Sequence, residues 1–171
     1  MSVGNWKTLA AVVLLSLTII GYWYYRQPRF AAGDRLPDFP ITLTEGRTAR
    51  FSEWTGKYVL IHFWGSWCGP CRAENRELSR IYAEFRERNF DIISVGIEQT
   101  RYAWEQACQT DGLVWPHHVL ELQRFEGPLA ERFHVRAIPT TFLVNPEGVI
   151  MGVNLPPAQI ERMLREAFKG T

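Results

Sequence analysis

The chain has 171 residues, of which 46% are hydrophobic and 13% aromatic, enough for one folded domain and an appendage. Its formal net charge of +1 provides no basic field, so we expect no nucleic-acid partner. Three cysteines in a chain of this length exclude a small scaffold held together by several disulfides.

An uncharged, largely apolar segment covers residues 8–25 and is just long enough for a helix to cross a bilayer. It ends in four aromatic residues, which are typical of the membrane–water interface. A cleaved signal peptide is the alternative, but the small residues that cleavage requires do not follow the segment directly. We therefore expect residues 1–26 to be an uncleaved signal anchor, residues 27–37 a linker and residues 38–171 a folded domain.

Charge hardly decides the orientation of this anchor, because Lys7 precedes it while Arg26 and Arg29 follow it. The tail before the anchor is short and the domain after it is large, which favours translocation of the domain. We therefore expect a single-pass cell-membrane protein with its domain on the extracytoplasmic, periplasmic side.

The remaining sequence predicts an α/β domain. A hairpin is expected over residues 39–51 with its turn at Gly46. Nearly unbroken apolar runs predict buried strands at 58–64 and 90–97, and apolar residues at helical spacing predict a helix over 69–88. We further expect a helix at 101–110, a strand at 114–120, a short helix at 128–134, two paired strands at 140–145 and 149–154, and a closing helix at 156–169. This alternation indicates a sandwich with a mixed central sheet.

The motif Cys68-Gly69-Pro70-Cys71 lies between the predicted strand 58–64 and the helix that follows. The partial positive charge of a helix N-terminus favours a thiolate at Cys68. Such a thiolate beside a second thiol can attack a disulfide and then release the mixed intermediate. Zinc would need further ligands, and the only other cysteine is Cys108. A structural disulfide that closes so short a loop would constrain the unfolded chain little, so we expect a redox-active disulfide between Cys68 and Cys71.

Two stretches carry a resemblance to the thioredoxin superfamily. Residues 59–74 resemble its active-site strand and helix start, and residues 137–148 resemble its cis-proline loop and hairpin. More closely, residues 34–169 resemble the membrane-tethered TlpA/ResA-like thiol–disulfide oxidoreductases, whose extra strand–helix insertion matches the stretch between the two motifs. The resemblance implies a thioredoxin-like three-layer sandwich with an N-terminal β-hairpin, preceded here by one transmembrane helix.

The resemblance also implies roles for individual residues. Cys68 would be the exposed nucleophile, Cys71 would resolve the mixed disulfide, and Pro139 would follow a cis peptide bond. That bond would turn the Ile138 backbone toward the sulfurs and offer an edge to an incoming peptide. We expect a substrate to bind over Trp67, Gly69, Pro70 and Ile138.

Two residues near the motif have open roles. Glu74 lies three residues after Cys71 on the buried stripe of the predicted helix, where a carboxyl should have a raised pKa and could carry the proton of Cys71. The TlpA/ResA-like proteins have an acidic residue at that offset, but a glutamate that merely favours the helix dipole is the alternative. His62 stands where thioredoxins place a buried carboxylate, and it either tunes Cys71 or is a hydrogen-bonded core histidine.

The remaining cysteine and the adjacent pair of histidines could in principle bind a metal, but their positions predict no metal site. We expect Cys108 to be a buried free thiol, with a regulatory disulfide as the alternative. His117 and His118 are adjacent on a predicted strand and therefore point to opposite faces, so they cannot easily share a metal. We expect no cofactor.

The sequence thus predicts a membrane-anchored extracytoplasmic thiol–disulfide oxidoreductase. We expect a reductase of protein disulfides, recharged by a membrane electron donor, because Gly69-Pro70 resembles the dipeptide of reducing thioredoxins. A dithiol oxidase or isomerase is one alternative, and a copper-handling thioredoxin-like binding module is another, since thiolates favour Cu(I). Cytochrome c maturation and general disulfide repair are both settings that the resemblance implies.

Overall fold

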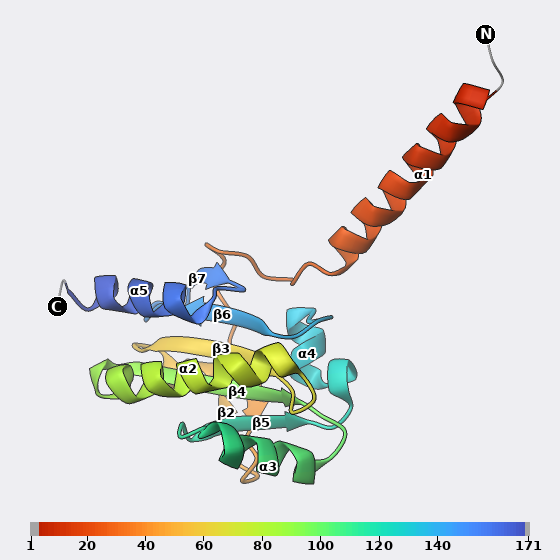
Figure 1. The fold of residues 1–171 in the computed structure, drawn as a ribbon. Coiled ribbons are helices and arrows are strands. Elements are labelled where there is room, and N and C mark those ends of the chain that lie inside the picture. The colour runs from red at the N-terminus through yellow and green to blue at the C-terminus, as the bar shows by residue number, and fades with distance from the viewer. Residues whose placement is uncertain (1–3, 170–171) are drawn as a thin grey trace.

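The computed structural model describes residues 4–169 (Figure 1), so residues 1–3 of the predicted anchor and residues 170–171 of the predicted domain lie outside it. A five-stranded sheet has the strand order β5-β4-β3-β6-β7, and β1 and β2 form a separate antiparallel pair. Strands β3, β4 and β5 are parallel, whereas β6 and β7 are antiparallel to their neighbours, which makes the central sheet mixed as predicted. The elements are α1 (Gly4–Tyr25), β1 (Pro40–Thr42), β2 (Thr48–Arg50), η1 (Phe51–Trp54), β3 (Tyr58–Trp64), α2 (Gly69–Phe85), η2 (Arg86–Arg88), β4 (Phe90–Ile97), α3 (Arg101–Asp111), β5 (His117–Glu121), η3 (Arg124–Glu126), α4 (Pro128–Phe133), β6 (Thr140–Val144), β7 (Ile150–Val153) and α5 (Pro157–Ala167).

The central strand β3 is apolar almost throughout because layers cover both faces of the sheet. Leu60 packs with Leu78 of α2 and Ile160 of α5 on one face. Phe63 packs on the other face in a cluster that includes the β1–β2 hairpin and α4. Side chains alternate along a strand, so His62 shares the face of Leu60 and lies under α2.

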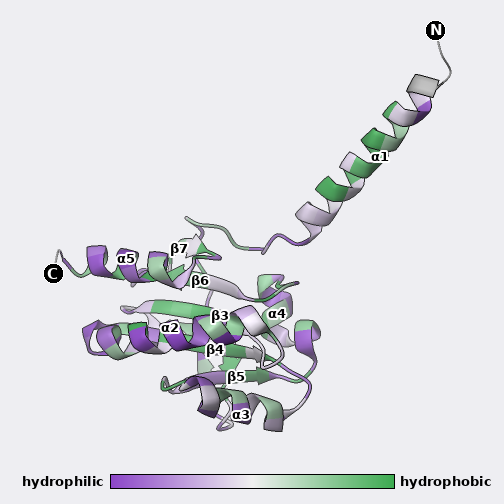
Figure 2. Cartoon of the chain, in the orientation of Figure 1, coloured by the Kyte–Doolittle hydropathy of each residue, from purple (hydrophilic) through white to green (hydrophobic). Residues whose placement is uncertain are grey.

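Helix α1 extends away from the domain (Figure 1), and its described side chains are exposed. It has 22 residues, or about 33 Å at 1.5 Å per residue, against about 30 Å for the hydrocarbon core of a bilayer. Figure 2 shows apolar residues along most of its length, whereas α2 and α5 carry hydrophilic residues on their outer faces. Over the part of the chain described, Trp6–Tyr25 is the one helix that meets the length and composition of a membrane span.

Residues 27–37, predicted as a linker, are bonded to the domain. The Arg29 amide donates to the Phe133 carbonyl at 3.0 Å, and the Gly33 amide donates to the Ile150 carbonyl at 2.8 Å. The ring of Phe30 packs edge-on against that of Phe133, with centroids 5.2 Å apart. This segment is therefore an ordered part of the domain surface.

The two largest differences between predicted and observed boundaries, each of three residues, have identifiable reasons. Strand β5 begins at His117, three residues after the predicted start at Val114, because Pro116 has no amide to donate to the ladder with β4. Helix α2 ends at Phe85, and the chain tightens into η2 before Asn89, whose positive φ of 67° turns it into β4. The hairpin turn was predicted correctly, with Gly46 at a φ of 89° that favours glycine.

Candidate active site

Cys68 and Cys71 form a disulfide at the start of α2. Cys68 is the N-cap of this helix, and its sulfur accepts a hydrogen bond of 3.2 Å from the Cys71 amide. The same amide, together with the helix dipole, would stabilise a thiolate at Cys68 after reduction. Cys68 is 7% exposed and Cys71 is 0% exposed. The expectation of an exposed Cys68 is therefore wrong for this oxidised state, although Cys68 is the more accessible of the two.

The loop before β6 lies against the disulfide. The Ile138–Pro139 peptide bond is cis, as predicted. The Ile138 carbonyl oxygen lies 3.9 Å from the Cys68 sulfur, a contact that a reduced thiol could use as a weak hydrogen bond. The Thr140 hydroxyl donates to the Ala137 carbonyl at 2.8 Å and closes the loop. The backbone edge of Ile138 therefore faces the sulfur that a partner would reach.

An exposed rim surrounds Cys68. Trp67 is 48% exposed, and its indole nitrogen donates to the Ile97 carbonyl at 2.7 Å. The guanidinium of Arg124 lies over the Trp67 ring, 4.7 Å from its centroid. Gly69 and Pro70 are exposed beside them. The predicted substrate-binding residues thus form one surface around the disulfide, and their role in binding stays a prediction.

Glu74 is half-buried one turn along α2. Burial, and to a smaller extent the charge of Glu77, raise the pKa of Glu74, in the direction that was predicted. Glu74 lines a small cavity of about 130 Å³ together with Pro139 and Thr141. The structure therefore brings Glu74 next to the cis-proline loop, from where a protonated carboxyl could serve Cys71.

His62 is fully buried on the α2 side of β3, opposite Ser94 and Thr141 in the neighbouring strands. Neither of its ring nitrogens has a hydrogen-bond partner among the described residues. Burial lowers the pKa of His62 from 6.5 to about 3, so the imidazole is neutral. The predicted alternative of a hydrogen-bonded core histidine is wrong in its bonding, and an effect on Cys71 stays a prediction.

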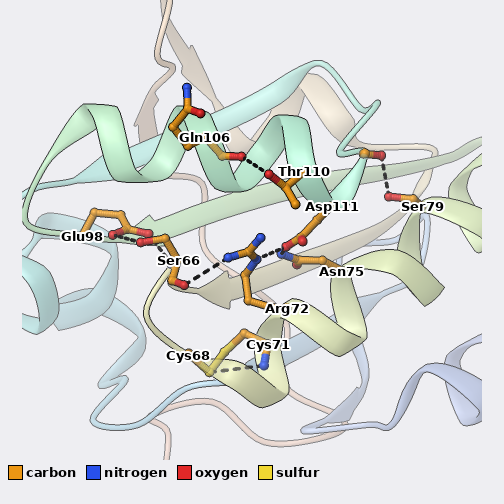
Figure 3. A network of polar contacts seen from close by, with 11 residues as sticks. Ser66, Cys68, Cys71, Arg72, Asn75, Ser79, Glu98, Gln106, Thr110 and Asp111 are labelled. Atoms are coloured by element: carbon orange, nitrogen blue, oxygen red, sulfur yellow. Dashed lines mark hydrogen bonds and ion pairs between the residues drawn. A yellow bond between two sulfur atoms is a disulfide. The ribbon is translucent and has the colours of Figure 1, made fainter.

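Sequence reasoning missed a buried carboxylate that holds the turn before Cys68. Glu98 is fully buried and accepts hydrogen bonds from the amide and the hydroxyl of Ser66 (Figure 3), the hydroxyl at 2.9 Å. Burial raises the pKa of Glu98, while the two Ser66 hydrogen bonds oppose that shift. Glu98 directly follows β4, at the carboxyl edge of the sheet where α/β sites form, and this position could have indicated it.

The sequence analysis also missed a group of polar side chains that connects α2 to α3. Arg72 forms an ion pair with the buried carboxylate of Asp111, which also accepts a hydrogen bond of 2.9 Å from the Asn75 amide (Figure 3). Arg72 also donates to the Ser66 carbonyl at 3.4 Å. Ser66 is therefore fixed from both sides, and the turn that carries Cys68 is preorganised.

The remaining cysteine and histidines are not assembled into a site. Cys108 is a free, partly buried thiol, and burial raises its pKa to about 12, which makes it a poor nucleophile. His117 lies 3.1 Å from a carboxylate oxygen of Asp91, whereas His118 packs on Trp115 across the sheet, so the two point to opposite faces as predicted. No cluster of three or more His, Cys, Asp or Glu side chains suited to a metal occurs in residues 4–169.

Comparisons with known proteins agree with this geometry. The thiol-disulfide oxidoreductase ResA of Geobacillus kaustophilus (strain HTA426) is 28% identical over 162 residues, which cover 90% of this chain and 91% of ResA. ResA of Bacillus subtilis (strain 168) is 29% identical over 147 residues, or 83% of this chain and 80% of ResA.

Solved structures agree in fold. The thioredoxin domain of a thiol-disulfide oxidoreductase from Bacteroides vulgatus superposes with a TM-score of 0.71 at 26% identity, covering 80% of this chain and 97% of that domain. StoA from Bacillus subtilis superposes with a TM-score of 0.61 at 25% identity, covering 75% of this chain and 96% of StoA. The predicted thioredoxin-like fold and the predicted enzyme class, a thiol–disulfide oxidoreductase, are confirmed. The sequence profile of the AhpC/TSA family matches residues 32–153, and the chain belongs to this family.

Proposed function

We propose that this enzyme is a membrane-anchored, extracytoplasmic reductase of protein disulfides. The observation that carries the proposal is the position of Cys68, the more accessible sulfur, at the N-terminus of α2 beside the Ile138 backbone edge. A partner peptide that pairs with this edge would bring its own disulfide to Cys68. Helix α1 is the proposed anchor, and its length supports a single span.

Each cycle transfers two electrons. The Cys68 thiolate attacks one sulfur of the substrate disulfide, and the other substrate sulfur leaves as a thiolate that takes up a proton. The thiolate of Cys71 then attacks the Cys68 sulfur, which releases the second substrate thiol and leaves the Cys68–Cys71 disulfide. Glu74 lies three residues after Cys71, and we assign to it the proton that Cys71 gives up. A membrane electron donor returns both electrons.

The reduction potential of the Cys68–Cys71 pair tests the direction of electron flow. The full chain in detergent micelles would be equilibrated in glutathione buffers and its free thiols would be trapped. A value at or below about −220 mV supports a reductase, because thioredoxin lies near about −270 mV. A value above about −160 mV, toward the strong oxidants near about −120 mV, would make the protein an oxidase or isomerase instead.

Single cysteine variants test the mechanism. With insulin as substrate and dithiothreitol as the source of electrons, Cys68→Ser should abolish turnover, and Cys71→Ser should accumulate a mixed disulfide with the substrate. Cys108→Ser is the matched control and should keep wild-type activity, because Cys108 is a free thiol of high pKa. Turnover by Cys68→Ser would overturn the mechanism. Stoichiometric Cu(I) binding by the reduced protein without disulfide turnover would favour the copper-handling alternative.

A further inference from the structure

A guanidinium is held over the indole ring that precedes Cys68. The guanidinium of Arg124 lies 4.7 Å from the centroid of the Trp67 ring. The indole itself is fixed by its hydrogen bond of 2.7 Å to the Ile97 carbonyl and by the ring of Phe125, which packs edge-on with centroids 6.3 Å apart. A positive charge over the face of a fixed indole is stabilised there by the π electrons of the ring.

The backbone of Arg124 has a conformation that residues with a Cβ rarely adopt. Its φ is 57°, in the left-handed region, and the residue opens the short turn η3 that follows β5. Such conformations cost free energy and are found mainly where the surrounding structure enforces them, often at binding sites. The end of this turn is also fixed, because Gly127 packs so closely on the buried Glu121 carboxylate that a Cβ would overlap it. The fold therefore holds Arg124 in a defined place beside Trp67.

A cavity opens beside this guanidinium. Its volume of about 270 Å³ lies just below the range of about 300–1,000 Å³ that is typical of small-molecule sites, so it is large enough for one amino-acid side chain. Arg124 and Trp67 line it together with Gln99 and Thr100, which are exposed polar residues, and with the buried Glu98. Its accessible polar groups are therefore a cation, an amide and a hydroxyl, all of which can donate hydrogen bonds.

The charge of Arg124 is not neutralised within the part of the chain that the structure describes. No carboxylate of residues 4–169 forms an ion pair with it, and its buried Nε atom has no hydrogen-bond partner there. Glu98 lines the same cavity, but both of its oxygens already accept hydrogen bonds from Ser66, and its side chain is 1% exposed. Arg124 therefore keeps a positive charge that is available to a ligand.

The cavity lies beside the path of a partner peptide. Trp67 and Ile138 meet at Gly65, where a Cβ would lie 2.7 Å from the indole nitrogen and 3.1 Å from the Ile138 side chain. The Ile138 carbonyl also contacts the Cys68 sulfur. A peptide that pairs with the Ile138 edge and presents its sulfur to Cys68 would therefore have its neighbouring residues over Trp67, beside Arg124.

We infer that Arg124 and this cavity bind a carboxylate side chain of the substrate protein, an Asp or Glu close in sequence to the cysteine that Cys68 attacks. A carboxylate accepts hydrogen bonds on both oxygens, which matches the fork of donors of a guanidinium. The indole holds the guanidinium in place beforehand, so little side-chain freedom is lost on binding. The inference rests on the proposed reduction of protein disulfides and gives the substrate class, disulfides with acidic neighbours.

Three peptides that differ only in charge test this specificity. Each has one cysteine, activated as a mixed disulfide with pyridine-2-thiol, and carries Glu, Gln or Lys at the positions around that cysteine. The full chain with Cys108→Ser, reduced and in a neutral detergent, would be mixed with each peptide. The Cys68 thiolate attacks the peptide sulfur, and pyridine-2-thiolate leaves with the electron pair, takes up a proton and is detected by absorbance as the thione. Cys71 then attacks the Cys68 sulfur and releases the peptide thiol.

We expect the Glu peptide to react about fivefold faster than the Gln peptide, the effect of a partly exposed ion pair, and the Lys peptide to react more slowly than either. Arg124→Gln should make the Glu and Gln peptides react at equal rates, and Arg124→Glu should reverse the order in favour of the Lys peptide. Arg76→Gln is the matched control, because it removes the same charge from an exposed position of α2, and it should keep the preference for Glu.

Two results would overturn the inference: wild-type rates that do not favour the Glu peptide, or a preference for Glu that persists in Arg124→Gln. A wild-type preference for the Lys peptide would contradict it in a specific way, by assigning the cavity to Glu98. Failure of the proposed function would look different, because the reduced protein would then release thione from none of the three peptides and would not reduce insulin.

Discussion

Replacing His62 with leucine should remove part of the acid sensitivity of the fold. His62 is fully buried without a hydrogen-bond partner among the described residues, and burial lowers its pKa from 6.5 to about 3. In the unfolded chain its pKa returns to the ordinary value near 6.5. Between these two pKa values the unfolded state binds a proton that the folded state does not. The stability that neutral His62 permits is therefore complete above pH 6.5 and is lost as the pH falls toward 3.

The size of the effect follows from the unfolded-state pKa. At pH 5, protonation of His62 in the unfolded state lowers the free energy of unfolding by about 2 kcal/mol, and at pH 7.5 by only about 0.1 kcal/mol. The folded-state pKa of about 3 lies well below both conditions and hardly changes this difference. About 2 kcal/mol is a large share of the roughly 5–15 kcal/mol that stabilises a domain.

Urea unfolding of the full chain in detergent micelles, with the disulfide intact and tryptophan fluorescence as the signal, measures the effect at pH 7.5 and pH 5. Relative to wild type, His62→Leu should gain about 2 kcal/mol on going to the lower pH. Leu60→Ala is the matched control, because Leu60 is fully buried on the same face of β3 and does not titrate. It should cost about 2–5 kcal/mol at both pH values. A His62→Leu difference that does not change with pH would refute the buried, neutral imidazole.

Three further predictions concern the surroundings of the disulfide. Arg72→Met leaves the buried carboxylate of Asp111 without its ion pair and should cost about 3–5 kcal/mol in urea unfolding, most of which the double variant with Asp111→Leu should restore. Gly96→Ala would place a Cβ 2.8 Å from the Trp104 ring and should cost about 1–3 kcal/mol, which thermal unfolding can measure. Glu74→Gln should slow insulin reduction about tenfold or more. It should also remove the acidic limb of the pH–rate profile, which in wild type lies above the ordinary glutamate pKa of 4.5; an unchanged profile would exclude Glu74 as the proton carrier.

The parts of the fold that the sequence predicts well are those whose pattern has a local cause. Strands β3 and β4 are covered on both faces, so their apolar runs are nearly unbroken and their predicted ranges match the structure. The positions of helix ends and the extent of edge strands depend instead on contacts with neighbouring elements of the fold. The start of β5 was missed because it depends on whether Pro116 can join a ladder with β4, which only the sheet register shows.

The residues of the candidate site likewise fall into two groups: those that a local motif identifies, and those that only the three-dimensional structure brings together. Cys68 and Cys71 belong to a contiguous motif, and Pro139 belongs to another, so the sequence identifies them directly. Glu98 and Asp111 support this turn from 32 and 39 residues away, and no local pattern connects them to Ser66 or Arg72. That His62 has no hydrogen-bond partner among the described residues is likewise a property of packing, since its sequence position is equally compatible with a hydrogen bond.

The difference in exposure between the Cys68 and Cys71 sulfurs determines the order of events when a donor reduces the disulfide. An attacking thiolate can reach Cys68, whereas Cys71 is completely covered, so Cys71 is the sulfur that leaves. A thiolate released in a buried position needs a proton or a counter-charge. Glu74, whose pKa burial raises, lies three residues away on the same helix and can supply that proton. The Ile138 carbonyl lies 3.9 Å from the Cys68 sulfur, so a reductant that pairs with the Ile138 backbone edge would bring its thiolate to Cys68. A Cys71→Ser variant should therefore remain covalently linked to its membrane donor through Cys68, and Cys68→Ser should not.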